Sequence, residues 1–149
     1  LAAPLWLARA TNKLQSQYTS GASSIAQKAA EAAYTGSQEC VEEMRKAFER
    51  RRDLVVGLAR TIPGWKVNNP QGAFYLFPEV SSYFGKRYGD TVINNDSDLA
   101  MYLLEEGHVA TVAGSAFCTP GYIRLSYATS DDNIREAMRR IEAALAKLM

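Results

Sequence analysis

Hydrophobic residues recur at helical spacing over most of residues 1–61. From about Pro4 to Gln17 the apolar positions suit one face of a helix, with Pro4 in its first turn. A polar loop over residues 18–24 follows, and its last serines can cap a helix that ends near Gly36. From Ser37 to about Thr61 the apolar positions follow a period of about 3.6 residues, and glutamates and the arginine triplet 50–52 occupy the other face. We expect a long amphipathic helix there, with the triplet paired to glutamates.

The period shortens after Pro63 and Gly64. Residues Trp65–Val67 and Phe74–Phe77 form short aromatic and β-branched segments, which predict two strands. Residues 80–95 are rich in serine, tyrosine, glycine, aspartate and asparagine. That composition predicts an irregular surface segment with one short helical turn.

A capped helix and two further strands are expected next. The helix begins at Asp96 or Ser97 and stops at Gly107. Strands are predicted over Val109–Val112 and Tyr122–Tyr127, with a glycine-containing loop between them.

The C-terminal segment predicts a last amphipathic helix. Ser130 is a strong N-cap with acidic residues in the first turn, and the helix runs through Lys147. The order of helices, strands, helix, strands and helix predicts an α/β or α+β fold, in which helices cover a small mixed sheet. The length of 149 residues and the hydrophobic content of 47% suit one compact domain with a sizeable core.

Charge and cysteine content exclude several classes of function. The 17 basic and 16 acidic residues give a net charge of +1, so we expect no nucleic-acid partner and no anionic membrane surface. Cys40 and Cys118 lie far apart without metal-ligand spacing, which predicts neither a disulfide framework nor a metal site. No apolar run has the length of a membrane span. A soluble, cytoplasmic protein is expected.

The chain begins at Leu1, within an apolar stretch and without an initiator methionine. This start predicts a piece of a longer protein.

Two segments are weak candidates for chemistry. His108 is the single histidine, and it has no readable triad partners, so a catalytic role is not expected. The Gly114–Phe117 loop carries a glycine and a hydroxyl between two strands and could line a pocket, although such loops are more often plain turns.

Arg124 is the most informative residue, because its neighbours in the strand belong next to a core. A charge in such a strand is normally paired with an acid, and composition alone favours that structural explanation. The functional alternative is a ligand carboxylate, to which a planar guanidinium offers two parallel donors.

Four segments together resemble the aspartate aminotransferase-like, pyridoxal-phosphate-dependent enzymes of class I/II. They have the expected order and spacing, and the similarity covers essentially the whole chain. The segments are Ser20–Gln27 (SGASSIAQ), Pro70–Tyr75 (PQGAFY), Val112–Phe117 (VAGSAF) and Tyr122–Ala128 (YIRLSYA).

This resemblance implies a fold, a reaction and several site residues. Residues 1–36 would be terminal helices of the family's large domain, and residues 37–149 its C-terminal small domain. Arg124 would bind the α-carboxylate of an amino acid or 2-oxo acid. Gly72 and Phe74 would pack beside the substrate, while Tyr75 would belong to the core.

The resemblance also implies partners. The loop that includes Tyr18, Thr19 and Ser20 would approach the neighbouring subunit's active site in a homodimer. The reaction would move an amino group between an amino acid such as aspartate and a 2-oxo acid such as 2-oxoglutarate.

The sequence departs from the family pattern in three respects. Ala113 stands where proline is common, and Cys118 stands where glycine is common. None of the six lysines lies in the family's Ser-Lys-x-x-x-x-x-Gly-x-Arg context, so no catalytic residue is expected within this chain. The isolated chain is therefore expected to bind no pyridoxal phosphate and to be inactive. A non-catalytic amino-acid-binding or regulatory module, and a lyase or decarboxylase of the same fold, remain alternatives.

Overall fold

The computed structural model describes residues 2–149. Leu1, which belongs to the predicted large-domain segment 1–36, lies outside the described residues. The chain divides into two compact units, Leu1–Glu42 and Glu43–Met149. The assignment of 1–36 and 37–149 to two family domains stays a prediction.

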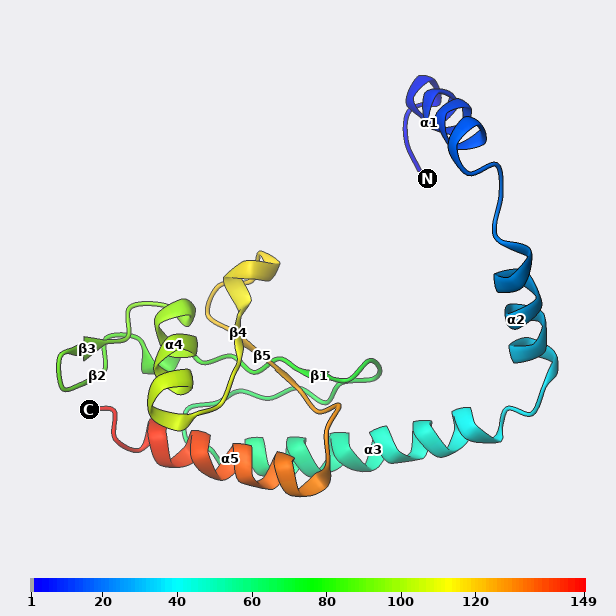
Figure 1. Cartoon of the computed structure of the whole chain (residues 1–149). Helices are drawn as coiled ribbons and strands as arrows, with labels where there is room; N and C mark the ends of the chain where they lie inside the picture. Colours follow the sequence, from blue (N-terminus) through cyan, green and yellow to red (C-terminus); the bar gives the residue numbers. More distant parts are fainter. Residues whose placement is uncertain (1) are drawn as a thin grey trace. The chain divides into compact units, whose positions relative to one another are not determined.

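The first unit contains two helices, α1 (Leu5–Tyr18) and α2 (Ser24–Thr35) (Figure 1). Both match the predicted helices to within one or two residues. Neither contains a buried residue, and large apolar side chains such as Trp6 and Tyr34 are exposed. Ser23 occupies the cap position of α2 as expected, but its side chain accepts no hydrogen bond there.

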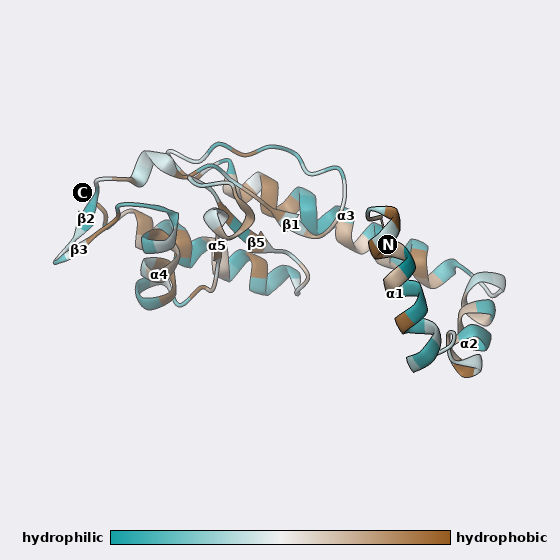
Figure 2. Ribbon diagram, turned by 90° about the horizontal axis from the view of Figure 1, so that it is seen from above, coloured by the Kyte–Doolittle hydropathy of each residue, from teal (hydrophilic) through white to brown (hydrophobic). Residues whose placement is uncertain are grey.

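The long helix α3 (Glu39–Ala59) is amphipathic, and apolar and polar bands alternate along it in Figure 2. Its C-terminal part buries Val55, Val56 and Ala59 in the core of the second unit. This burial confirms that the helix has an apolar face.

The arginine triplet of α3 pairs differently from the prediction. Arg52 lies 3.7 Å from Glu49 as expected, but its closest partner is Asp53 at 2.7 Å. Arg50 and Arg51 both reach Asp131, at 3.0 and 3.6 Å. The prediction of glutamate pairing was wrong for these two residues, because the final helix brings its acidic first turn beside α3.

Three strands form the main sheet in the order β1 (Tyr75–Leu76), β5 (Ile123–Ser126), β4 (Val112–Ala113). Both strand pairs are antiparallel, and so is the separate hairpin described below. The fold class is confirmed, whereas the prediction of a mixed sheet was wrong for the described strands. A parallel pair needs a crossover of a dozen or more residues, and the short turn between β4 and β5 permits only an antiparallel return.

Residues 80–95 are more regular than predicted. The expected short helical turn is η1 (Ser81–Tyr83). It is followed by a hairpin of β2 (Arg87–Tyr88) and β3 (Thr91–Val92), with Gly89 at φ 57° in the two-residue turn. Glycine supplies the positive φ that such tight hairpin turns require. The predicted strand Trp65–Val67 is reduced to one bridge between Lys66 and Glu79.

Two capped helices complete the second unit. Asn95, one residue before the predicted start, caps α4 (Asp96–Gly107) by accepting hydrogen bonds from the N–H groups of Ser97 and Asp98. Ser130 caps α5 (Asp131–Leu145) as expected, accepting from the Asn133 N–H at 3.2 Å. None of the helices in the described part of the chain has the length and apolarity of a membrane span.

Tyr102 joins α4 to α5 inside the core. Its side chain is 2% exposed, and its hydroxyl donates to the Ala144 carbonyl at 2.7 Å. Burial raises the pKa of Tyr102 from its usual value near 10 to about 12.

Tyr102→Phe removes this hydrogen bond with little change of volume. We expect it to lower the free energy of unfolding by about 1 kcal/mol at neutral pH. In the wild type, the stabilisation is fully present below pH 10 and is lost as the pH rises towards 12, because the folded state holds the neutral phenol. Part of this loss should disappear in Tyr102→Phe.

Urea unfolding between pH 7 and 12 measures both effects. Tyr34→Phe is the control, because the Tyr34 side chain is 87% exposed and its hydroxyl makes no hydrogen bond within residues 2–149. Equal curves for wild type and Tyr102→Phe would contradict the role of this hydroxyl.

Candidate functional site

Arg124 lies at the centre of the sheet, on the face opposite the core. The strand alternates, so Ile123 and Leu125 are buried while Arg124 points to the other side and is half-buried. Its guanidinium carbon lies 4.4 Å from the ring centre of Tyr75 and 4.3 Å from that of Phe117. The Arg124 cation therefore lies over the faces of two aromatic rings, to which it is attracted electrostatically.

No carboxylate of residues 2–149 lies within 4 Å of the Arg124 guanidinium. The acid pairing that composition favoured is therefore absent from the described chain. The planar guanidinium can therefore offer two parallel N–H donors to the carboxylate of a ligand.

The turn that carries Phe117 is tightly built. It is the 3-10 helix η2 (Gly114–Phe117), which joins β4 to the segment before β5. A Cβ at Gly114 would lie 2.3 Å from the Thr119 carbonyl oxygen and 2.8 Å from that of Tyr122. Only glycine fits at this close approach of backbones.

A buried carboxylate at the start of α4 accepts a hydrogen bond from this turn. Asp96, at the start of α4, is 2% exposed and accepts a hydrogen bond from the Ser115 N–H at 2.6 Å. Sequence reasoning treated Asp96 only as a helix-start residue, because an acid in a first helical turn is normally solvated. Its burial depends on the tertiary contact between α4 and η2, which no local pattern reveals.

The two departures from the family pattern near this turn have different backbone settings. Ala113 has φ −58° and ψ 136°, a conformation that proline also adopts. Cys118 has φ 57° and ψ 27°, in the left-handed region that favours glycine. Replacing glycine by cysteine therefore costs conformational strain at position 118, whereas alanine in place of proline at position 113 does not.

Neither Gly72 nor Phe74 makes a hydrogen bond or a ring contact with the Arg124 guanidinium in the described chain, although the Phe74 ring lies 4.5 Å from the ring of Tyr75. Both line a hollow of about 510 Å³, together with residues of α3 and Tyr127. The Phe74 ring lies 6.0 Å from that of Phe48. Ala73, between the two predicted residues, has φ 58°, and its carbonyl accepts from the Tyr127 hydroxyl at 3.1 Å.

Tyr75, rather than Phe74, is the aromatic residue of this segment that touches Arg124. Sequence reasoning placed Tyr75 in the core. The side chain is instead half-buried on the outer face of the sheet, because β1 pairs Tyr75 with Ser126 and not with a core position. Counting the alternation of the two paired strands could have found it.

Tyr18, Thr19 and Ser20 end α1 in the first unit. The Tyr18 side chain is 82% exposed. Thr19 closes the helix by donating its N–H to the Gln15 carbonyl at 3.0 Å, and Ser20 follows with φ 58°. The chain therefore presents these residues on an exposed, sharply turned corner.

His108 makes no side-chain hydrogen bond within the described residues. It follows α4 with φ 53° and borders shallow hollows together with Arg140. The described residues also contain no group of three or more metal-ligating side chains.

The lysines do not form a site for a phosphate-bearing aldehyde. At least three of the six are held by glutamates: Lys28 by Glu31, Lys66 by Glu79 and Lys147 by Glu106. The hydrogen bond to Glu79 holds the pKa of Lys66 above its usual value. A protonated amine is a poor nucleophile.

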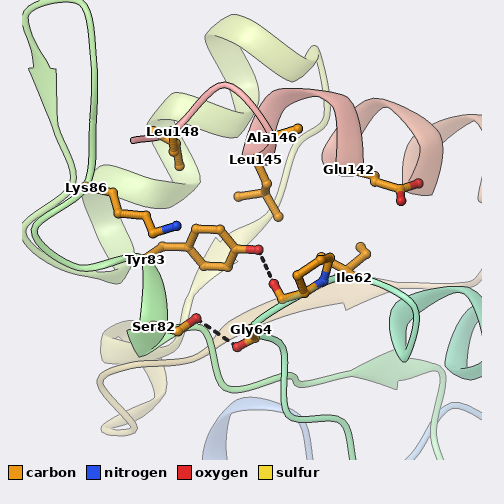
Figure 3. A pocket seen from close by; sticks show the side chains of 10 residues that line it. Ile62, Gly64, Ser82, Tyr83, Lys86, Glu142, Leu145, Ala146 and Leu148 are labelled. Carbon is orange, nitrogen blue, oxygen red and sulfur yellow. Dashed lines mark hydrogen bonds between the residues drawn. The ribbon is translucent and has the colours of Figure 1, made fainter.

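Lys86 borders a hollow of about 370 Å³, lined largely by apolar side chains of α5 and the Pro63 turn (Figure 3). The Lys86 ammonium lies 5.3 Å from the centre of the Tyr83 ring. The Tyr83 hydroxyl is already used, because it donates to the Pro63 carbonyl. Glu142 is the other charged side chain that lines this hollow, so it offers no anion site. The hollow beside Lys86 therefore does not fit the phosphate of pyridoxal phosphate.

Comparison with known proteins supports the resemblance seen in the motifs. A family model described as aminotransferase class I and II matches residues 1–141. The chain is 47% identical, over 99% of its length, to an aspartate/prephenate aminotransferase of Cereibacter sphaeroides and covers 37% of that protein. It is 46% identical to a bifunctional aspartate and glutamate/aspartate-prephenate aminotransferase of Petunia hybrida and covers 32% of it.

A solved structure shows the same arrangement. The aspartate aminotransferase of Rhizobium meliloti superimposes with a TM-score of 0.87 at 42% identity, over 99% of this chain and 37% of that one. This chain therefore spans about a third of the length of the relatives it matches.

Cys118→Gly should stabilise the chain, because it relieves the left-handed strain described above. We expect the free energy of unfolding to rise by about 0.5 to 1 kcal/mol, measured by urea unfolding. Cys118→Ala is the control, since it removes the thiol but keeps a Cβ, and it should leave the stability nearly unchanged. An equal loss of stability in Cys118→Gly and Cys118→Ala would show that the thiol, and not the backbone conformation, matters at this position.

Proposed function

Because this chain belongs to the class I and II aminotransferases, we propose that the protein carrying it transfers an amino group from aspartate to a 2-oxo acid through pyridoxal phosphate. The printed names of the relatives, aspartate or aspartate/prephenate aminotransferases, support this choice of donor. The observation that carries the proposal is the Arg124 guanidinium, which lies over the rings of Tyr75 and Phe117 and lacks an acid partner among residues 2–149.

Arg124 is proposed to bind the α-carboxylate of the substrate. A carboxylate that approaches the edge of the guanidinium receives two parallel, charge-assisted hydrogen bonds, which fix both its position and its plane. Contacts with Tyr75 and Phe117 restrict the Arg124 side chain before the substrate arrives. Less side-chain entropy is then lost on binding.

Other residues are proposed to complete the site in the whole protein. Gly72 and Phe74, which lie directly before β1, would approach the substrate on domain closure. Tyr18, Thr19 and Ser20 would reach the active site of the second subunit in a homodimer. Their exposure in the first unit leaves them available for such a contact.

The cofactor is proposed to be held by residues outside this chain. When bound, pyridoxal phosphate supplies the aldehyde carbon that takes up the amino group and the ring that accepts electrons. Residues 2–149 contribute substrate binding and orientation instead. We therefore infer that the isolated chain is inactive.

Arg124→Ala in the complete aminotransferase should lower kcat/KM for aspartate by about a hundredfold or more, because charge-assisted hydrogen bonds contribute about 1.5 to 3 kcal/mol each. Steady-state kinetics measure this loss. Arg60→Ala is the control, since Arg60 is exposed and its side chain makes no hydrogen bond or ion pair within the described chain. Equal kinetics for Arg124→Ala and the wild type would exclude the proposed role.

Cofactor binding tests whether the residues that hold pyridoxal phosphate lie outside this chain. The 149-residue chain, incubated with pyridoxal phosphate and then reduced with borohydride, should show no lysine labelled at full occupancy, because its lysines lack an adjacent phosphate site. The complete protein should carry one label per chain. Peptide mapping by mass spectrometry reads the result. A single fully labelled lysine within residues 1–149 would refute this proposal.

A further inference from the structure

The strongest unexplained feature is the buried Asp96 carboxylate. It is 2% exposed and is the one charged residue in the core of the described chain. Burying a carboxylate is unfavourable unless hydrogen bonds compensate for the lost water. Its hydrogen bond from the Ser115 N–H is short, at 2.6 Å, and spans two segments that are far apart in the sequence.

An acid in this position is not required to cap the helix. Asn95 already accepts from the N–H groups of Ser97 and Asp98, each at 2.9 Å. Asp98 supplies a second acid in the first turn, so the favourable interaction with the helix dipole does not depend on Asp96. The bond from Asp96 to Ser115 therefore serves the turn rather than the helix.

The η2 turn connects the Asp96 hydrogen bond to the proposed substrate-binding residue Arg124. Ser115 lies two residues before Phe117 in η2, and Gly114 is pressed against two carbonyl oxygens. The Phe117 ring at the end of the turn lies under the Arg124 guanidinium, whose carbon is 4.3 Å from the ring centre. Phe117 itself is 42% exposed, so packing alone does not fix its ring.

We propose that Asp96 is a positioning residue, which holds the Gly114–Phe117 turn so that Phe117 keeps the Arg124 guanidinium in the plane that binds a substrate carboxylate. The proposal rests on the proposed function of Arg124. Asp96 touches neither the substrate nor Arg124 in this scheme, and it acts through the Ser115 N–H and the aromatic ring.

The test is a double-mutant cycle in the complete aminotransferase, with single-turnover rates that remain measurable in slow variants. Asp96→Ala should lower kcat/KM for aspartate by about tenfold, mostly through KM, because a misplaced binding group weakens the interaction with its ligand. In the Arg124→Ala background the same change should cost less than about twofold, since the two residues act as one unit. Asp96→Asn keeps an acceptor oxygen for Ser115 and should restore kcat/KM to within about threefold of the wild type.

Asp98→Ala is the matched control. It removes an acid from the same helical turn, but its bonds go to Asn94, at 2.9 and 3.0 Å, and not to η2. It should leave kcat/KM unchanged while altering the stability of α4.

Three results would overturn the positioning role: a loss in Asp98→Ala equal to that in Asp96→Ala, additive effects of Asp96→Ala and Arg124→Ala, or unchanged kinetics in Asp96→Ala. If Asp96→Ala does not fold, Asp96→Ser replaces it in the cycle, because its hydroxyl is too short to reach Ser115. Failure of both to fold would assign Asp96 a purely structural role. Arg124→Ala measured alone tests the proposed function separately, so the two failures are distinguishable.

Discussion

A charged side chain can stand in the central strand of this sheet because the two faces of β5 meet different surroundings. Ile123 and Leu125 pack into the core, while Arg124 between them meets two aromatic rings. Strand pairing sets this alternation, and a shift by one residue would bury the guanidinium and expose the leucine. The candidate site therefore depends on the register of three short strands more than on any single contact.

The helices were predictable because each carries its own periodic signal. Ser130 begins α5 as its N-cap, and α4 ends at Gly107 as predicted, although His108 takes the left-handed cap conformation. Strand direction was not predictable from such signals, since it depends on which segments become neighbours. The hairpin at Gly89 was missed although its turn residues were visible, because a polar, exposed pair of strands lacks the apolar alternation that marks a buried one.

The residues of the candidate site also fall into a group that the sequence could predict and a group that it could not. Arg124 was identifiable, because a lone charge in an apolar strand contradicts its local pattern. Phe117 and the buried Asp96 were not, since each lies in a segment whose local pattern predicts exposure. Their environment arises only when α4, η2 and β5 come together. Local sequence patterns therefore identified the charged residue Arg124 but not the residues that surround it in the folded chain.

The helices α1 and α2 bury none of their side chains, and this affects the stability of their helical conformation. Isolated helices of this length are marginal in water, because nucleation is costly and only a few hydrogen bonds follow it. Without a packed face, their helix–coil equilibrium is set by intrinsic propensity alone. Any surface that covers Trp6 or Tyr34 shifts this equilibrium towards the helix, so part of the binding free energy of that surface is spent on ordering the chain.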